Sequence, residues 1–240
     1  MTPYARREEV LIVVIGGLAT AVVSYWTGLW GLVPAVLMLA LLSFYRDPER
    51  RPPTDPGLIL APADGKVVEV TRNASGPDGR PVLRIMIFLS VFDVHVNRSP
   101  CAGRVVEVRY RPGEFLNALR PEADQYNESN TLTLDPATPL PGPVRVRQIA
   151  GVLARRIVCR ARPGDRLAAG QRYGMIKLGS RTEVCLPESA EWEVCVRVGD
   201  RARAGRTVLA RLRADAPVGA GGGATKPQTT DVRLPPPESR

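Results

Sequence analysis

Side chains that can transfer protons near neutral pH are scarce in this sequence of 240 residues. His95 is the only histidine, and imidazole is the one side chain whose ordinary pKa lies close to 7. It follows an apolar run that ends at Leu89 and precedes a turn at Ser99-Pro100, as expected of a side chain presented at the end of a strand. A purely structural histidine would fit the same pattern. The sequence therefore offers one candidate general base.

Two carboxylates are candidates to orient this imidazole. Asp93 lies two residues before His95 and would share its face on an extended strand. Asp64 lies in the segment Ala61-Pro62-Ala63-Asp64-Gly65, where turn chemistry alone also accounts for an Asp-Gly pair. A carboxylate that holds one imidazole nitrogen leaves the other free to accept a proton, as in a Ser-His-Asp arrangement.

The candidate nucleophile is Ser180, which follows Gly179 between two apolar runs. A serine hydroxyl is a weak nucleophile unless a base lies beside it and donors surround the developing oxyanion. The G-x-S-x-G turn of α/β-hydrolases is absent, and so is the alternation of strands and helices that carries it. An ordinary serine hydrolase is therefore not expected.

The charge and composition of the sequence limit the classes of molecule that the protein is expected to bind. The formal net charge is +9, and next to a membrane segment such a basic chain points to an anionic lipid surface. The basic residues are scattered and aromatic residues make up only 5%, so nucleic acid is not an expected partner. The four cysteines form no C-x-x-C pair, and with a single histidine no metal site is expected.

The N-terminal apolar stretch is long enough to enter a membrane, because no charged residue occurs between Glu9 and Arg46. A straight crossing needs about 20 residues, and this stretch exceeds that length and divides at a segment rich in Gly and Trp, 26–31. We expect residues 1–45 to form a hydrophobic helical hairpin; a single long tilted helix is the alternative. Arginines flank both ends, which predicts a cell-membrane location with the following domain on the cytoplasmic side.

A charged, proline-broken linker at 46–56 separates the apolar stretch from a different pattern. Over 57–214, short apolar runs with a period of two alternate with Gly, Pro and Asp turns, which predicts a mainly β catalytic domain, a β-sandwich or barrel. One short helix is expected near 114–120. Residues 215–240 are rich in Gly and Pro and are expected to be disordered.

An internal repeat links residues 162–171 to 197–206. Each copy has a Gly-Asp turn, a short strand, an Ala-Gly turn and a second strand. This rhythm is similar to that of lipoyl-like domains, the barrel-sandwich hybrids, although two ordinary β-turns would give the same pattern.

Taken together, four segments make the chain resemble the phosphatidylserine decarboxylase family, and within it the short, archaeal-type group. They occur in the family's order, and the resemblance covers approximately residues 40 to 190. The segments are Phe44-Tyr45-Arg46-Asp47-Pro48, Ala61-Pro62-Ala63-Asp64-Gly65, Asp93-Val94-His95-Val96-Asn97-Arg98-Ser99-Pro100 and Leu178-Gly179-Ser180.

The resemblance implies an enzyme that makes its own cofactor by cutting itself between Gly179 and Ser180. The Ser180 hydroxyl would attack the Gly179 carbonyl to form an ester, and loss of the Ser180 Cα proton would expel the Gly179 carboxylate and leave dehydroalanine. Tautomerisation and loss of ammonia then give a pyruvoyl group at position 180, so that neither pyridoxal phosphate nor a metal is needed. The products would be a β chain, 1–179, and an α chain, 180–240, joined as a heterodimer or a higher oligomer.

The resemblance also implies roles for the candidate residues. Ser180, His95 and Asp64 form the catalytic set, and Asp64 is the implied partner of the imidazole, with Asp93 in support. Arg98 and Arg181 flank the proposed centre as candidate phosphate ligands, or else are solvated surface arginines. Longer family members carry a second histidine where this chain has Arg98. Whether His95 serves both self-cleavage and decarboxylation stays open at this point.

The implied reaction converts phosphatidylserine to phosphatidylethanolamine and CO2 through a Schiff base between the pyruvoyl ketone and the serine amine of the lipid, with the ketone as electron sink. One alternative is a pyruvoyl decarboxylase for another serine-headed lipid, such as archaetidylserine. The other is a membrane-anchored lipoyl-like carrier or adaptor without catalysis. A carrier needs a lysine at an exposed hairpin tip, and neither Lys66 nor Lys177 lies in a recognisable acceptor motif.

Overall fold

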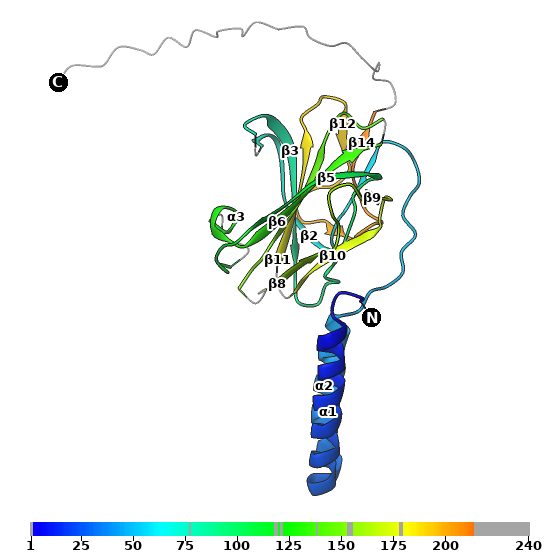
Figure 1. Cartoon of the computed structure of the whole chain (residues 1–240), viewed down its shortest axis with the longest axis vertical. Helices are drawn as coiled ribbons and strands as arrows, with labels where there is room; N and C mark the ends of the chain where they lie inside the picture. The colour runs from blue at the N-terminus through cyan, green and yellow to red at the C-terminus, as the bar shows by residue number, and fades with distance from the viewer. Residues whose placement is uncertain are drawn as a thin grey trace, which may run out of the picture.

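The apolar N-terminal stretch folds into two helices that run side by side beneath a β domain (Figure 1). Helix α1 (Arg6–Thr27) ends in a 3-10 turn, η1 (Gly28–Gly31), and α2 (Leu32–Phe44) returns toward the domain. Gly28 reverses the chain with a φ of 60°, a conformation that glycine adopts without strain. The helices pack closely because Gly16 of α1 leaves room for Met38 of α2. The chain therefore enters and leaves the hairpin at the same end, as predicted.

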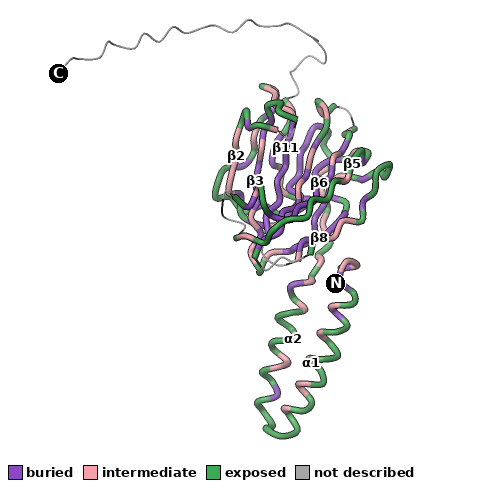
Figure 2. Tube along the Cα trace, turned by 60° about the vertical axis from the view of Figure 1, so that its left-hand side comes forward, coloured by how far each residue is buried: buried purple, intermediate pink, exposed green. Residues whose placement is uncertain are grey.

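The hairpin is exposed along most of its length (Figure 2), and many of its exposed side chains are large and apolar. The segment Arg6–Phe44 is long and apolar enough to cross a membrane, and none of its most apolar window, with a mean hydropathy of 2.0, is buried. At the turn, Trp26 and Trp30 are 78% and 71% exposed. Uncovered apolar area on this scale is suited to lipid rather than to water.

The structure, a computed structural model, describes residues 2–76, 78–117, 120, 122–137, 139–152, 156–177 and 180–213. Two features predicted from the sequence lie outside these residues: the tail at 215–240, and Gly179 on one side of the expected cleavage point.

Residues from Leu58 onward form an antiparallel β domain with three sheets among the described residues. The large sheet has eight strands in the order β13-β2-β3-β11-β7-β6-β5-β9, and two three-stranded sheets, β1-β14-β12 and β4-β10-β8, lie beside it. The strands are β1 (Leu58–Leu60), β2 (Gly65–Ser75), β3 (Pro81–Leu89), β4 (Val96–Arg98), β5 (Gly103–Arg111), β6 (Ser129–Pro136), β7 (Val144–Ile149), β8 (Arg156–Cys159), β9 (Arg166–Leu167), β10 (Arg172–Lys177), β11 (Ser180–Pro187), β12 (Trp192–Val194), β13 (Arg201–Ala202) and β14 (Val208–Leu212). The predicted mainly β, barrel-sandwich character is confirmed.

One of the two middle strands of the large sheet is β11, which is buried along almost all of its length between β3 and β7 (Figure 2). Side chains alternate between the two faces of a strand. Val184 and Leu186 face the hydrophobic core, whereas Glu183 and Arg181 on the other face meet charged neighbours. This alternation decides which residues of β11 can reach the interior.

The internal repeat of the sequence is also a repeat of the structure. In each copy the aspartate of the Gly-Asp turn, Asp165 or Asp200, accepts a hydrogen bond from the N–H three residues before it at 2.8 Å. The Ala-Gly turns of the two copies meet, because a Cβ on Gly205 would lie only 3.3 Å from the Cα of Gly170. The two copies therefore contact each other at these turns, although their short strands, β9 and β13, pair with β5 and β2.

The prediction of a helix near 114–120 is wrong for those residues of the range that the structure describes. Glu114 forms a bridge with Asn127, and a short helix, α3 (Ala123–Tyr126), lies further along the chain. The Asn127 side-chain amide replaces helical hydrogen bonding at Leu116, because it accepts from the Leu116 N–H at 2.9 Å and donates to the Leu116 carbonyl at 2.8 Å. A long-range side-chain contact thus overrides local helix propensity.

Two glycines at opposite ends of the β2–β3 hairpin provide a test of how closely β2 and β3 approach each other. We expect Gly65→Ala to lower the free energy of unfolding by about 3 kcal/mol, because its Cβ would lie 2.1 Å from the Phe88 carbonyl oxygen at a φ of +150°. Gly79→Ala should cost only about 1 kcal/mol, since Gly79 has a positive φ but nothing within 4 Å of the added Cβ. Urea unfolding in detergent measures both, and equal losses would contradict the close approach at Gly65.

Candidate active site

His95 directly precedes β4 and Ser180 begins β11. Strand β4 pairs with β10, which lies toward the end of the β domain that faces the hairpin (Figure 1). Ser180 pairs with Leu89 at the end of β3. The chain then runs through residues 90–95 into β4, where the His95 carbonyl accepts a hydrogen bond from the Ile176 N–H of β10 at 3.2 Å. Because β10 leads toward Ser180, both ends of the His95 loop lie beside the segment that carries the serine.

Ser180 is fully buried, with 0% of its surface exposed. By strand alternation its side chain shares the inner face of β11 with Thr182 and Val184. Its Oγ has no hydrogen-bond partner within the described part of the chain. A buried hydroxyl without a partner is costly for a folded protein and calls for an explanation, such as a reactive role.

His95 is likewise 0% exposed and has a defined tautomer. Its Nδ1 lies 2.9 Å from the Asp93 carbonyl oxygen, and because that oxygen only accepts, Nδ1 must carry the proton. Burial lowers the His95 pKa to about 4, although the Asp93 carbonyl and carboxylate act in the opposite direction. At neutral pH the imidazole is therefore uncharged. Its Nε2 is a bare acceptor, buried and without a partner in the described structure.

A buried amide network connects the His95 strand to the Ser180 strand. The Asn97 side chain approaches Thr182 Oγ1 at 3.5 Å, and Gln148 donates to Asn97 Oδ1 at 2.8 Å. Asn130 in turn donates to Gln148 at 3.1 Å. Thr182 shares a strand face with Ser180, so this network fixes β4 against β11 close to the two unpartnered atoms. Period-two alternation points to Thr182, but no sequence feature singles out Gln148 or Asn130.

The structure places Asp64 in an ion pair instead of a hydrogen bond to His95. Its carboxylate accepts from both terminal nitrogens of Arg50, at 2.8 and 2.7 Å, and from the Ala204 N–H at 2.7 Å. The negative charge of Asp64 acts to raise the His95 pKa, although it is the smallest of the causes that act on that pKa, so Asp64 lies near His95. Asp64 therefore lies next to the site, and its carboxylate oxygens bind Arg50 of the linker.

Asp93 touches His95 through its backbone rather than through its carboxylate. One carboxylate oxygen accepts from both the N–H and the hydroxyl of Ser90 at 2.8 Å, and the other pairs with Arg201 at 2.9 Å. The side chain therefore closes the turn before His95, and that turn presents the carbonyl that orients the imidazole.

The two arginines predicted to flank the centre already have carboxylate partners. Arg98 pairs with Asp47 at 3.0 Å and also donates to the Gly170 and Pro48 carbonyls, with its side chain 6% exposed. Arg181 lies on the outer face of β11, opposite to Ser180, and pairs with Asp124. Both guanidinium groups are therefore already engaged by carboxylates of the protein.

The predicted linker is bound tightly to the β domain. Asp47 pairs with Arg172 at 2.6 Å in addition to Arg98, and Arg50 pairs with Asp64. These partly buried pairs depend on one another, because removal of one partner would leave a buried charge uncompensated. The hairpin therefore has a fixed position relative to the candidate site.

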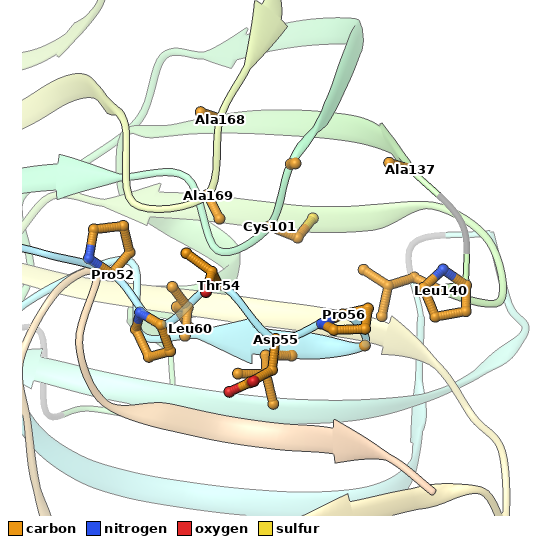
Figure 3. Close-up of a pocket in the computed structure, with 15 residues that line it drawn as sticks. Pro52, Thr54, Asp55, Pro56, Leu60, Cys101, Ala137, Leu140, Ala168 and Ala169 are labelled. Carbon is orange, nitrogen blue, oxygen red and sulfur yellow. The ribbon is translucent and has the colours of Figure 1, made fainter. Parts of the chain in front are cut away.

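A cavity of about 390 Å³ lies between the linker and the domain, with Pro52, Thr54 and Pro56 on one side and Cys101 and other residues of the domain on the other (Figure 3). Its lining includes neither Ser180 nor His95, so it is separate from the candidate site.

The described residues contain no group of three or more His, Cys, Asp or Glu side chains arranged to hold a metal ion. The two candidate carrier lysines lie within strands rather than at a hairpin tip: Lys66 is in β2 and Lys177 in β10, where it pairs with Glu8 of α1. Among the described residues, the lipoyl-like carrier alternative therefore lacks a lysine at an exposed hairpin tip: Lys66 is exposed but lies inside β2.

Together, the fold and the site define a class of protein: a β-domain protein with an apolar helical hairpin, in which a buried serine and a buried, neutral histidine lie on adjoining segments. Neither Ser180 Oγ nor His95 Nε2 has a hydrogen-bond partner among the described residues. The family model for phosphatidylserine decarboxylase matches residues 37–210. The chain belongs to the phosphatidylserine decarboxylase family.

Similar proteins cover nearly the whole chain. The phosphatidylserine decarboxylase proenzyme of Rhodopirellula baltica is 47% identical over 215 residues, 88% of this chain and 89% of that protein. The proteins of the same name from Pelobacter propionicus and Nitrosomonas eutropha are 43% and 42% identical, over 82% and 88% of this chain and 86% and 96% of their own lengths. The family resemblance inferred from the motifs is confirmed. Membership of the short, archaeal-type group stays a prediction.

Because the chain has a single histidine, its protonation can be observed directly. In a Ser180→Ala variant with ¹⁵N-labelled histidine, we expect a neutral imidazole that carries its proton on Nδ1 and titrates with a pKa of about 4. A lowered pKa means that the basic form is present above pH 4 and is lost as the pH falls through that value, so self-cleavage of the native chain should slow in the same range. An ordinary pKa near 6.5 or a proton on Nε2 would contradict the described site.

Proposed function

We propose that the protein decarboxylates phosphatidylserine to phosphatidylethanolamine and CO2 after converting Ser180 into a pyruvoyl group by cleavage of the Gly179–Ser180 bond. The observation that carries the proposal is that two buried atoms without a partner in the described structure, Ser180 Oγ and His95 Nε2, lie on segments that meet where β3 ends, because Ser180 pairs with Leu89. The relatives' name, phosphatidylserine decarboxylase proenzyme, supports both the reaction and a precursor that is cut.

In the proposed self-cleavage, His95 Nε2 accepts the hydroxyl proton of Ser180 as Oγ attacks the preceding carbonyl. A neutral imidazole with Nδ1 held by the Asp93 carbonyl is the correct tautomer for this transfer. The inner-face position of Ser180 keeps bulk water away, which favours elimination over hydrolysis of the ester. Loss of the Ser180 Cα proton then breaks the Cβ–O bond, releases the new carboxylate at residue 179 and leaves dehydroalanine at position 180. Its imine tautomer takes up one water molecule and releases ammonia, which gives the ketone of the pyruvoyl group.

The site fits a pyruvoyl group, because position 180 is buried and faces no competing hydrogen-bond partner in the described structure. Such a group supplies a ketone that withdraws the electron pair left when CO2 departs. His95 would take up the proton that the substrate's ammonium group must lose, and would return a proton to the substrate Cα. One residue can in this way serve both self-cleavage and decarboxylation, without a second histidine at the position of Arg98.

Cleavage would leave the two chains associated. The α chain would begin with β11, which stays hydrogen-bonded to β3 and β7 of the β chain on its two sides. It would also contribute β14, which pairs with β1. Separation would expose a central strand and the core beneath it, so we propose a stable αβ heterodimer as the mature unit.

We also propose that the hairpin inserts into the cell membrane from the cytoplasmic side. Helix α2 has 13 residues and would span only about 20 Å, less than the hydrocarbon thickness, whereas both ends of the hairpin join the β domain. Arginines precede and follow the apolar stretch, which favours a cytoplasmic position for both ends.

Ser180→Ala should remain a single uncut chain and release no CO2 from phosphatidylserine, because it lacks the attacking oxygen. His95→Ala should slow self-cleavage by at least about 100-fold, the usual contribution of a general base. Denaturing electrophoresis and CO2 release measure these effects, and Ser189→Ala, in a turn of the α chain, is the matched control that should be cut normally. Cleavage or CO2 release by Ser180→Ala would refute the assigned centre.

A further inference from the structure

Helix α2, which leads from the apolar hairpin to the β domain, ends at a residue that contacts His95, the candidate base. Phe44 is the last residue of α2, and its ring centroid lies 4.3 Å from that of the His95 imidazole, with the planes inclined by 42°. Phe44 is 7% exposed and His95 0%. Aromatic rings at this separation attract each other beyond their buried area. The contact joins the membrane segment to the reacting group without an intervening residue.

We propose that Phe44 is a positioning residue for His95, so that the hairpin forms one wall of the catalytic site as well as attaching the protein to the membrane. This inference rests on the proposed role of His95. The Asp93 carbonyl fixes one nitrogen of the imidazole, but a single hydrogen bond leaves the ring free to tilt. The Phe44 ring covers the imidazole and limits that movement.

Phe44 also keeps water from the imidazole. Loss of solvent is the largest cause of the low His95 pKa, and the Phe44 ring is part of the apolar material that surrounds His95. Without this ring, water would reach His95, its pKa would rise, and the fraction of neutral base at mildly acidic pH would fall.

The rest of the junction holds Phe44 in place. Phe44 packs with Ala5 at the start of the hairpin and with Met175 of β10 in one buried cluster. Glu8 of α1 pairs with Lys177, three residues before Ser180, and Arg160 donates to the Pro3 carbonyl at 2.7 Å. The hairpin thus contacts the His95 side through α2 and the Ser180 side through α1.

Phe44→Ala in the full-length protein tests the proposal, with Leu41→Ala as the matched control. Leu41 is on the same helix, three residues earlier, and is 48% exposed, so its loss reduces apolar membrane area without touching His95. With water-soluble short-chain phosphatidylserine, we expect Phe44→Ala to lower kcat about tenfold, with little change in KM, and to shift the acid limb of the pH profile upward by about one pH unit. Leu41→Ala should match the native protein in both.

A wild-type pH profile and kcat in Phe44→Ala would overturn the proposal and would leave membrane attachment as the role of the hairpin. If Phe44→Ala fails to fold, Phe44→Val keeps an apolar side chain and should shift the acid limb in the same direction by less; a folded Phe44→Val with an unchanged profile would be equally contradictory. Native protein that is uncut and inactive would instead refute the proposed function itself.

A second inference rests on a different observation, the arginine two residues beyond α2. Arg46 is exposed and donates to the Ser43 carbonyl at 2.8 Å and to the Phe92 carbonyl in the loop that carries His95. It has no carboxylate partner among the described residues, in contrast to Arg98 and Arg181. Its charge is among the causes that lower the His95 pKa, so it lies near the site.

We infer that Arg46 binds the phosphate of the lipid headgroup. A guanidinium has five donor hydrogens in a planar fork, of which the two carbonyls use only part. Arg46 lies where α2 emerges from the apolar hairpin, the level at which lipid phosphates occur. Beside it, Phe92 is 83% exposed and presents an apolar surface next to the charge. A lipid held there would have its serine moiety on the His95 side.

Arg46→Gln tests this assignment, with Arg51→Gln as a control that removes the same charge from the same linker. Arg51 is exposed and has no hydrogen bond or ion pair in the described structure. On water-soluble short-chain phosphatidylserine, Arg46→Gln should raise KM about tenfold and leave kcat and self-cleavage within about twofold. An equal KM in both variants would overturn the inference, and an effect seen only on anionic vesicles would assign Arg46 to general membrane attraction.

Discussion

A buried, neutral imidazole is the constraint on which the rest of this structure depends. The His95 imidazole has one hydrogen bond within the described structure, from Nδ1 to a backbone carbonyl, and burial holds its pKa at about 4. Such a group is a proton acceptor throughout the physiological range, and it must be kept dry and oriented to remain one. The turn closed by Asp93, the amide network around Asn97 and the aromatic ring of Phe44 each contribute to this condition.

The fold also suits a chain that is cut in its own core. Ser180 is the first residue of a long strand that is buried at every position but its last, and the strands on both sides of it precede the cleavage point. Chain cleavage there would break one backbone bond but no strand pairing, so the new terminus would stay inside the domain. The backbone could therefore be cut before Ser180, as the proposed chemistry requires, while the tertiary structure stays intact.

Much of the fold was predictable because its signals are local. The uncharged stretch before Arg46, the glycines at its midpoint, the period-two runs and the repeated Gly-Asp turns all follow from neighbouring residues. The site was only partly predictable, because its partners are distant in sequence. Asp64 binds Arg50 rather than His95, and the linker that supplies Arg50 has no regular secondary structure. The outward position of Arg181 follows from strand alternation once Ser180 faces inward, whereas the contact of Phe44 with His95 has no local signal.

The intact mass of the smaller chain from purified native protein tests the central claim most directly. Conversion of Ser180 into a pyruvoyl group predicts a fragment, residues 180–240, that is lighter by one ammonia than the same fragment with an N-terminal serine, and that reacts with hydroxylamine. A fragment that retains its serine would indicate simple hydrolysis, and a single uncut chain in an active preparation would contradict self-cleavage altogether.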